Sequence, residues 1–203
     1  MIPGLDLNDT SRAPLARLNS SGLPIYAGQV NKVWRGLVQV EGSLEPSVPV
    51  ALKWMSGVHK LPVELACALA GTALGLPIPR GVAVLAQRDQ LPGLPGNAKP
   101  LAGTDDYLCF GSVHQWPDDS TARLLGDSSA DEFTWRSLCS GPTAAPGAAW
   151  DELAANADRH AGNLIYDGAK FWFIDHELAL QPIAQVMNKF TRDWFTESGF
   201  MEV

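Results

Sequence analysis

Residues 156–180 have the sequence NADRHAGNLIYDGAKFWFIDHELAL, and this stretch indicates most about how the chain folds and what chemistry it carries. Two short runs within it, 164–166 and 171–174, are rich in aliphatic and aromatic residues that suit a β-sheet surface. Between the runs stands Asp167-Gly168, a pair typical of a two-residue hairpin turn because that turn requires positive φ. We therefore expect a β-hairpin.

The expected hairpin would gather three polar side chains at one end. Asn163 directly precedes the first strand, Asp175 follows the second, and Asp158 lies in the loop ahead of both. Taken singly, such residues most often form turns or cap loops. Together they supply carboxylate and amide oxygens, which are the ligands that Mg²⁺ prefers. The combination predicts a site that holds a divalent cation beside a phosphate and a hydroxyl group.

The same segment resembles the catalytic region of kinases. Residues 158–163, DRHAGN, have the D-x-x-x-x-N spacing of the protein-kinase catalytic loop, and Asp175 stands where these kinases carry the metal-binding D-F-G aspartate. The D-R-H-x-x-N wording is similar to that of phosphatidylinositol 3- and 4-kinases, whereas the I-D-H ending at residues 174–176 is more similar to bacterial HipA-like kinases. The resemblance implies an α+β, two-lobed protein-kinase-like fold. Its N-lobe would be an antiparallel sheet with one helix, and its C-lobe would be reduced and mainly helical.

The N-terminal half contains candidates for the nucleotide-binding residues of such a fold. Hydrophobic patterning predicts three strands and a helix, at residues 23–27, 33–40, 48–55 and 62–74. Lys53 would lie on the third strand and Glu64 in the first turn of the helix. The resemblance implies that Lys53 binds the nucleotide phosphates and that Glu64 orients it. The alternative is an exposed lysine and a glutamate favoured by the helix dipole.

The loop between the first two strands is the expected phosphate-binding segment. Gly28, Asn31 and Lys32 would contact phosphate oxygens there. The loop lacks the G-x-G-x-x-G pattern of protein kinases and offers only Gly28 and then Gly36. HipA-like and lipid kinases also lack the full pattern, so the departure favours them. An ordinary hairpin turn is the alternative.

Composition excludes some classes of partner. The chain has 203 residues, of which 46% are hydrophobic and 18% charged, and its net charge is −7. An acidic surface predicts neither direct nucleic-acid binding nor membrane binding. No apolar run is long enough to cross a bilayer, and the start has no signal pattern. Cys67, Cys109 and Cys139 are widely spaced, which favours reduced, mostly buried thiols in the cytoplasm.

We expect one kinase-like domain over residues 1–203. It would consist of an N-terminal arm, an N-lobe with the hinge, and a reduced C-lobe, at residues 1–20, 21–113 and 114–203. The C-terminal pattern predicts a strand at 107–113, a flexible run at 140–147, and three helices at 116–125, 148–155 and 183–195. Only 28 residues follow Asp175, too few for the usual peptide platform. The substrate would then dock on residues 111–146, or a partner protein would complete or inhibit the site.

The resemblance implies an ATP- and Mg²⁺-dependent phosphotransferase, a serine/threonine kinase similar to HipA-like toxins, with a protein substrate. Asn163 and Asp175 would bind Mg²⁺, and Asp158 would orient the acceptor hydroxyl and take its proton. His160 would stabilise the transferring phosphoryl group, or brace the loop by bonding a backbone carbonyl. Two other functions stay open: a nucleotide-binding regulator without turnover, and a metal-dependent phosphohydrolase that uses His160 and His176 with the two aspartates.

Overall fold

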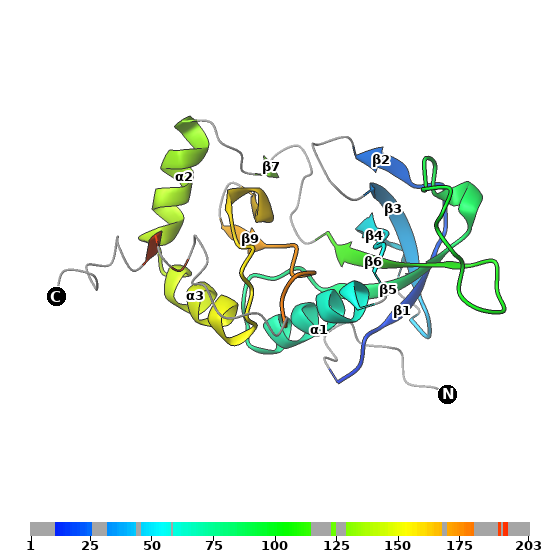
Figure 1. Cartoon of the computed structure of the whole chain (residues 1–203), viewed down its shortest axis with the longest axis horizontal. Helices are drawn as coiled ribbons and strands as arrows, with labels where there is room; N and C mark the ends of the chain where they lie inside the picture. Colours follow the sequence, from blue (N-terminus) through cyan, green and yellow to red (C-terminus); the bar gives the residue numbers. More distant parts are fainter. Residues whose placement is uncertain are drawn as a thin grey trace. The chain divides into compact units, whose positions relative to one another are not determined.

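The structure is a computed structural model, and it describes residues 11–25, 32–43, 46–57, 59–114, 123–124, 129–167, 170–180, 191 and 193–194. The chain divides into two compact units. The first contains Met1–Ala70 and Pro79–Gln115, and the second contains Gly71–Ile78 and Trp116–Val203. Figure 1 labels their elements. Within the described part of the chain, the helices are all too short or too polar to cross a lipid bilayer.

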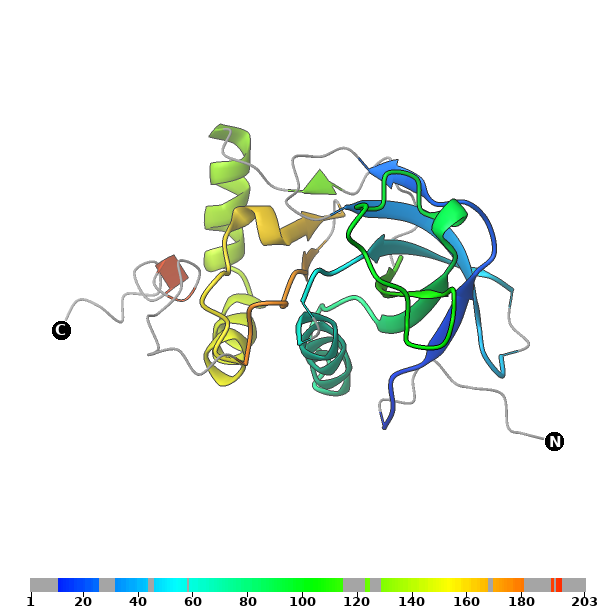
Figure 2. The same cartoon turned by 45° about the vertical axis from the view of Figure 1, so that its right-hand side comes forward.

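The first unit is built around a β-sheet that closes on itself. Its strands are β1 (Leu15–Leu18), β2 (Leu23–Ile25), β3 (Val33–Val40), β4 (Val48–Lys53), β5 (Gly81–Ala86) and β6 (Tyr107–Val113). They are hydrogen-bonded in the order β1-β5-β6-β4-β3-β2, and β1 also pairs with β3. This extra pairing closes five strands into a barrel, which is seen from a second direction in Figure 2. The short strand β2 continues along β3 beyond β1.

The barrel interior is filled by the alternate residues of its strands. In β3, buried and exposed side chains alternate along the strand, which is the pattern of a sheet with one face in the core. Gly36 lies at one of the buried positions of β3. A Cβ at this glycine would lie 2.6 Å from Leu18 Cδ1 and 2.9 Å from Leu52 Cδ1. Gly36 therefore makes room for core side chains and is not part of a phosphate-binding loop.

The prediction of a two-lobed protein-kinase-like fold is wrong. The protein is α+β, but a closed barrel replaces the expected antiparallel N-lobe sheet, and β1 and β5 in this barrel run parallel. The polar arm expected over residues 1–20 contains β1, and no element is predicted at residues 81–86, yet these two strands close the barrel. The strand expected at 107–113 is confirmed as β6. It pairs with β4 on one side and β5 on the other, so it is a strand of the barrel.

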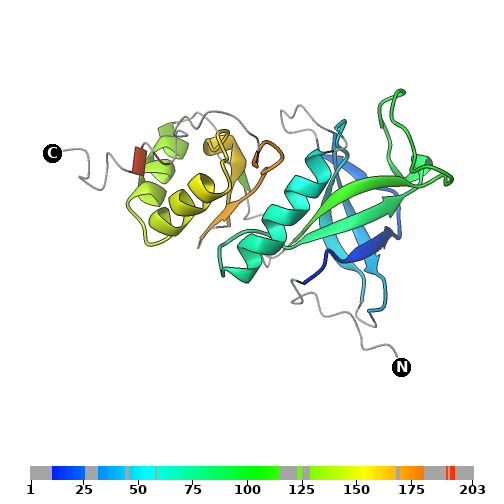
Figure 3. The same ribbon diagram turned by 60° about the horizontal axis from the view of Figure 1, so that its bottom comes forward.

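Helix α1 (Lys60–Ala73) packs on the outside of the barrel strand β5. A Cβ at Gly81 would lie 2.7 Å from the Ala68 Cβ, so the glycine allows a close approach of helix and strand. Figure 3 shows α1 running along the barrel strands. The helix begins two residues earlier than predicted, and Glu64 is therefore beyond the first turn, which has no acidic residue. Glu64 is buried, and it is not the first-turn glutamate that the helix-dipole alternative requires.

The part of the second unit up to Leu180 contains, among its described residues, a small sheet and the helices α2 and α3. The described elements are β7 (Arg123–Leu124), α2 (Ser129–Cys139), α3 (Ala144–Leu153), a 3₁₀ turn η2 (Ala161–Asn163), β8 (Leu164–Tyr166) and β9 (Phe171–Phe173). The strands are ordered β7-β8-β9. A further 3₁₀ turn, η1 (Arg88–Gln90), belongs to the first unit.

The predicted hairpin is confirmed as β8 and β9, with Leu164 opposite Phe173 and Tyr166 opposite Phe171. The pairing extends one step further, because the Asp167 N–H donates to the Lys170 carbonyl. The Asp167 carboxylate accepts from the Lys170 N–H and from the Trp172 indole N–H, both at 2.8 Å. Asp167 thus closes the turn instead of occupying its centre. Gly168 lies outside the described residues.

Three other expectations fail or fall outside the described residues. The helix expected at 116–125 is wrong at Arg123–Leu124, which form β7, and its remaining positions are not described. The flexible run expected at 140–147 is wrong from Ala144 onward, because α3 begins there and includes most of the helix expected at 148–155. Helix α2 was not predicted. The helix expected at 183–195 lies mostly outside the described residues; Thr191, Asp193 and Trp194 are helical.

The three cysteines are buried, and none forms a disulfide, as expected for reduced thiols. Burial raises the pKa of the Cys109 thiol from its ordinary value of 9.0 to about 12. The thiol ionises above pH 9 in the unfolded chain and only near pH 12 in the folded protein. The stabilisation that the buried neutral thiol gives the folded state is therefore complete below pH 9 and is lost as pH rises toward 12. The free energy of unfolding should fall by about 1.4 kcal/mol per pH unit in that window. Urea denaturation between pH 8 and about pH 10.5 measures this slope, and the Cys109→Ala variant should show a shallower one.

Candidate functional site

The loop ahead of β8 is fixed by a side chain at its start. Asn156 is buried, and its Nδ2 donates to Asp151 Oδ1 at 2.9 Å, which ties the loop to the end of α3. Its Oδ1 accepts from the Asp158 backbone N–H at 3.3 Å, a contact that forms an Asx turn. Ala155, just before it, has a φ of 49°. The chain therefore leaves α3 in a sharp, defined turn that leads directly to Asp158.

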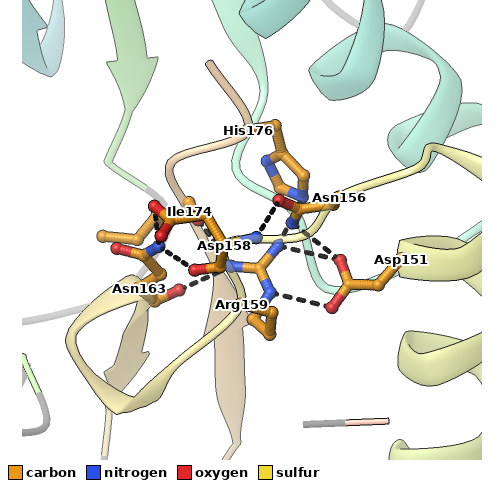
Figure 4. Close-up of polar contacts among 7 residues, drawn as sticks. All are labelled: Asp151, Asn156, Asp158, Arg159, Asn163, Ile174 and His176. Carbon is orange, nitrogen blue, oxygen red and sulfur yellow. Dashed lines mark hydrogen bonds and ion pairs between the residues drawn. The ribbon is translucent and has the colours of Figure 1, made fainter. Parts of the chain in front are cut away.

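Asp158 and Asn163 contact one another directly. The Asn163 Nδ2 donates to the Asp158 backbone carbonyl at 2.8 Å and to the Asp158 carboxylate at 3.4 Å. Asn163 is buried at the end of η2, whereas Asp158 is exposed. The amide nitrogen is thus committed to Asp158, while Oδ1 of Asn163 bonds to none of the described residues. Figure 4 shows this pair together with the buried residues Asp151, Arg159 and His176.

Asp175 lies one residue beyond a backbone pair that continues the hairpin. The Ile174 N–H donates to the Asn163 carbonyl at 3.1 Å, so the hairpin brings the backbones of Asn163 and Asp175 close together, as expected. Asp175 is half-buried and has a φ of 61°. This left-handed conformation costs most L-residues about 1–2 kcal/mol, and aspartate and asparagine adopt it more often than the others. Strain of this kind gathers at functional sites.

The centre of the loop is held by Arg159, whose side chain is fully buried. Its Nε donates to Asp151 Oδ2 at 3.1 Å, and its Nη2 to Asp151 Oδ1 at 3.3 Å. Its Nη1 donates to two backbone carbonyls, those of Asn163 at 2.8 Å and Ile174 at 2.6 Å. Figure 4 shows the guanidinium reaching α3, the loop and the end of the hairpin. Arg159 therefore joins the three segments that make up the candidate site.

The buried cation also fixes the state of a histidine. The Arg159 Nη2 lies 2.7 Å from His176 Nε2. Because a guanidinium can only donate, Nε2 is the acceptor, and the His176 proton resides on Nδ1. The Arg159 guanidinium lies over the Phe173 ring at 5.2 Å, and Trp150 meets the His176 ring edge-on at 6.3 Å. His176 is thus a part of the buried network.

His160 braces the loop, although not in the way expected. Its Nδ1 accepts a hydrogen bond from the Gly162 backbone N–H at 3.0 Å, so it caps η2 by bonding an N–H and not a carbonyl. The ring is exposed, and an accepting Nδ1 places the proton on Nε2. The exposed ring therefore carries an Nε2–H donor three positions before Asn163.

The residues expected to bind nucleotide belong to the first unit, whereas the residues around Asp158 belong to the second. Lys53 is the half-buried last residue of β4 and lies opposite Val33 and Phe110 in the sheet. Glu64 is buried in α1, and Lys32 is exposed just before β3. Gly28 and Asn31 lie outside the described residues.

Two residues of the site were not predicted: Asp151 and Asn156. The sequence around the first, AAWDELAA, predicts only a short helix leading into the loop. Asp151 lies among alanines and tryptophan on the buried face, while its neighbour Glu152 is half-buried. A buried carboxylate needs a partner that offsets its charge. In the sequence, Arg159 was the residue that could have indicated such a partner for Asp151. The pairing of Asp151 with Arg159 could be predicted only from the geometry of the loop that joins them.

No cluster or known relative identifies this site. Among the described residues, no three His, Cys, Asp or Glu side chains are grouped so as to hold a metal ion. The candidate set instead has two carboxylates and one amide. No protein-family model matches the chain, and no curated protein matches it. The functional argument therefore rests on the local motif and on the geometry of the described residues from Asp151 to His176.

Proposed function

We propose that the protein is an ATP- and Mg²⁺-dependent phosphotransferase that transfers the γ-phosphoryl group to a hydroxyl group, with a serine or threonine of a protein as the acceptor. The observation that carries the proposal is the Asp158–Asn163 pair. The Asn163 amide nitrogen donates to the Asp158 backbone carbonyl at 2.8 Å and to its exposed carboxylate at 3.4 Å, and the amide oxygen has no partner among the described residues. Phosphoryl transfer depends on this kind of positioning more than on covalent chemistry.

The donor set fits Mg²⁺. This ion takes one or two carboxylates from a protein and completes its shell with water and substrate phosphates. Asn163 would contribute Oδ1 and Asp175 its carboxylate, and the hydrogen bond from Ile174 to Asn163 holds the two residues at one end of the hairpin. A bound Mg²⁺ neutralises charge on the β- and γ-phosphates. The strained φ of Asp175 supports a functional role.

Asp158 would accept the proton of the acceptor hydroxyl. A general base must be within hydrogen-bond reach of that proton, and it acts best when its position is fixed. The backbone of Asp158 is held on both sides, through its N–H by Asn156 and through its carbonyl by Asn163. His160 would offer its exposed Nε2–H to the transferring phosphoryl group while Nδ1 caps η2.

The nucleotide-binding roles stay predictions from the resemblance to HipA-like kinases. Lys53 would neutralise phosphate oxygens, and Glu64 would orient it. Lys32, with Gly28 and Asn31, would contact further phosphate oxygens. The resemblance supports the proposal through the local motif alone, because the fold it implies is wrong.

The phosphohydrolase alternative is less well supported. It requires His160 and His176 as metal ligands beside the aspartates. His176 is buried with its Nε2 against Arg159, and His160 uses Nδ1 to accept from Gly162. Both nitrogens that could bind a metal without changing tautomer are therefore engaged in holding the loop. The other alternative is a nucleotide-binding regulator without catalysis. It differs from the proposed kinase in binding ATP without transferring phosphate.

Incubation of the protein with Mg²⁺, γ-labelled ATP and a cell lysate should transfer label to protein. The Asp158→Asn variant should lower the rate of transfer by about 10²–10⁴-fold, because the amide cannot take the hydroxyl proton. The substitution keeps the size of the side chain and leaves the backbone bonds of residue 158 to Asn156 and Asn163 in place, so it changes only the 3.4 Å contact between the carboxylate and Asn163 Nδ2. Circular dichroism checks that the variant is folded.

Asp167→Asn is the matched control, because Asp167 lies in the same hairpin but closes its turn. That variant should keep the transfer rate. ATP binding without transfer in the unsubstituted protein would support the regulator instead. Metal-dependent phosphate release that is unaffected by Lys53→Ala would support the hydrolase. Either result overturns the proposal.

A further inference from the structure

We infer that Arg159 is a positioning residue, which holds the two metal-binding residues at a fixed separation. The inference rests on the proposed function, since it concerns the same metal site. The key contact is a single nitrogen, Nη1, that donates to the carbonyls of Asn163 and Ile174. The first of these residues carries the amide ligand, and the second immediately precedes Asp175.

The contact is rigid because the guanidinium is held from the opposite side. Nε and Nη2 bind both oxygens of Asp151, which stands on α3. Nη2 also contacts His176, the residue that follows Asp175. The residues on both sides of Asp175 are therefore attached to one planar group, and that group is attached to a helix. Asp175 itself has the strained φ that such attachment can maintain.

This arrangement uses the shape of arginine and not only its charge. A guanidinium has five donors in a fixed plane, whereas a lysine ammonium has three donors on one atom. A lysine in place of Arg159 would still neutralise Asp151, but it could not reach Asp151, the two carbonyls and His176 together. Arg159→Lys therefore separates the positioning of the ligands from the charge balance of the core.

Metal affinity reports the position of the ligands directly. Groups that orient metal ligands typically change affinity by about 10–100-fold when they are replaced. We expect Arg159→Lys to weaken Mn²⁺ binding at least about tenfold. Mn²⁺ substitutes for Mg²⁺ at oxygen sites, and electron paramagnetic resonance of free Mn²⁺ gives the affinity without any assay of transfer. The measurement is made with the full chain, with and without ATP, at a temperature where circular dichroism shows it folded.

Asp151→Glu is the second variant. It keeps both buried charges and displaces the anchor of the guanidinium by one methylene, so it should weaken Mn²⁺ binding in the same direction. Arg136→Lys is the matched control, because Arg136 is an exposed arginine of the same unit, paired with Glu132 on α2. It should bind Mn²⁺ as the unsubstituted protein does.

The outcomes separate this inference from the proposed function. Loss of binding in Asp175→Asn together with weaker binding in Arg159→Lys and Asp151→Glu supports both. A second outcome is that Asp175→Asn loses Mn²⁺ binding, while a folded Arg159→Lys or Asp151→Glu variant binds Mn²⁺ within about twofold of the original affinity. This outcome overturns the positioning role of Arg159 and leaves the metal site supported. If the unsubstituted protein binds no Mn²⁺, or Asp175→Asn binds it equally, the metal site fails and the inference fails with it.

Discussion

Arg159→Met should lower the free energy of unfolding by about 3–5 kcal/mol, because removal of one partner leaves a buried charge without compensation. The side chains of Arg159 and Asp151 are both fully buried, and they are joined by two hydrogen bonds. The substitution also removes the donor to the carbonyls of Asn163 and Ile174. Urea denaturation followed by circular dichroism measures the loss.

The double variant Asp151→Leu with Arg159→Met tests the cause. Replacing both members of a buried ion pair by apolar residues removes the uncompensated charge, so the double variant should be more stable than Arg159→Met alone. Arg136→Met is the control for loss of an arginine. Its exposed pair with Glu132, four residues away on α2, is worth about 0.3–0.5 kcal/mol. A loss for Arg159→Met as small as that for Arg136→Met would contradict the account.

The sequence predicted those parts of the fold that depend on neighbours along the chain. The strands β3 and β6 have strong alternation or apolar content, and their bounds were predicted as the structure has them. The strands β1 and β5 were missed, because four residues in a polar segment and six small apolar residues give weak local signals. Their stability comes from pairing with each other and with distant strands. Closure of the barrel depends on those contacts between distant strands. The fold predicted from local patterns was therefore wrong.

In the candidate site too, the features that depend on neighbouring residues were predicted, and those that depend on distant contacts were not. Asn163 and Asp175 were expected at one end of a hairpin because the strands between them are short and local, and the backbone pairing agrees. Asp151 and its pairing with Arg159 could not be predicted, since an aspartate beside a tryptophan in an apolar helix has the same local pattern whether it is buried or exposed. Burial and the direction of the guanidinium settle the pairing, and both are properties of the folded unit.

The failure of the fold prediction does not contradict the proposed site. Function resides in the geometry of particular residues, and the same chemistry recurs on unrelated folds. The segment that resembles a kinase catalytic loop is held by α3, η2 and the β8–β9 hairpin, all within the second unit. The barrel of the first unit contributes nothing to the contacts among Asp158, Arg159 and Asn163. The local argument therefore stands on the second unit alone.

Asp175→Asn should abolish most of the phosphoryl transfer while the protein stays folded. Asparagine has the size of aspartate and adopts positive φ readily, so the backbone at a φ of 61° is not strained further. An amide is a weaker Mg²⁺ ligand than a carboxylate. Metal stabilisation of the transition state is worth several kcal/mol, and the rate of transfer should therefore fall by about 10³-fold. Labelled ATP measures the rate, and urea denaturation measures the stability.

Asp167→Asn should give the opposite pair of results, and the contrast identifies the role of Asp175. The Asp167 carboxylate accepts from the Lys170 N–H and the Trp172 indole, so its replacement weakens the turn and lowers stability by about 1 kcal/mol. Transfer should continue in that variant. If Asp175→Asn instead lost stability and kept its transfer rate, the strained backbone at residue 175 would serve the packing of His176 and Arg159, and the metal site would have to lie elsewhere. Lost transfer in a folded Asp175→Asn variant would therefore show that the charge of Asp175, and not its backbone conformation, serves the reaction.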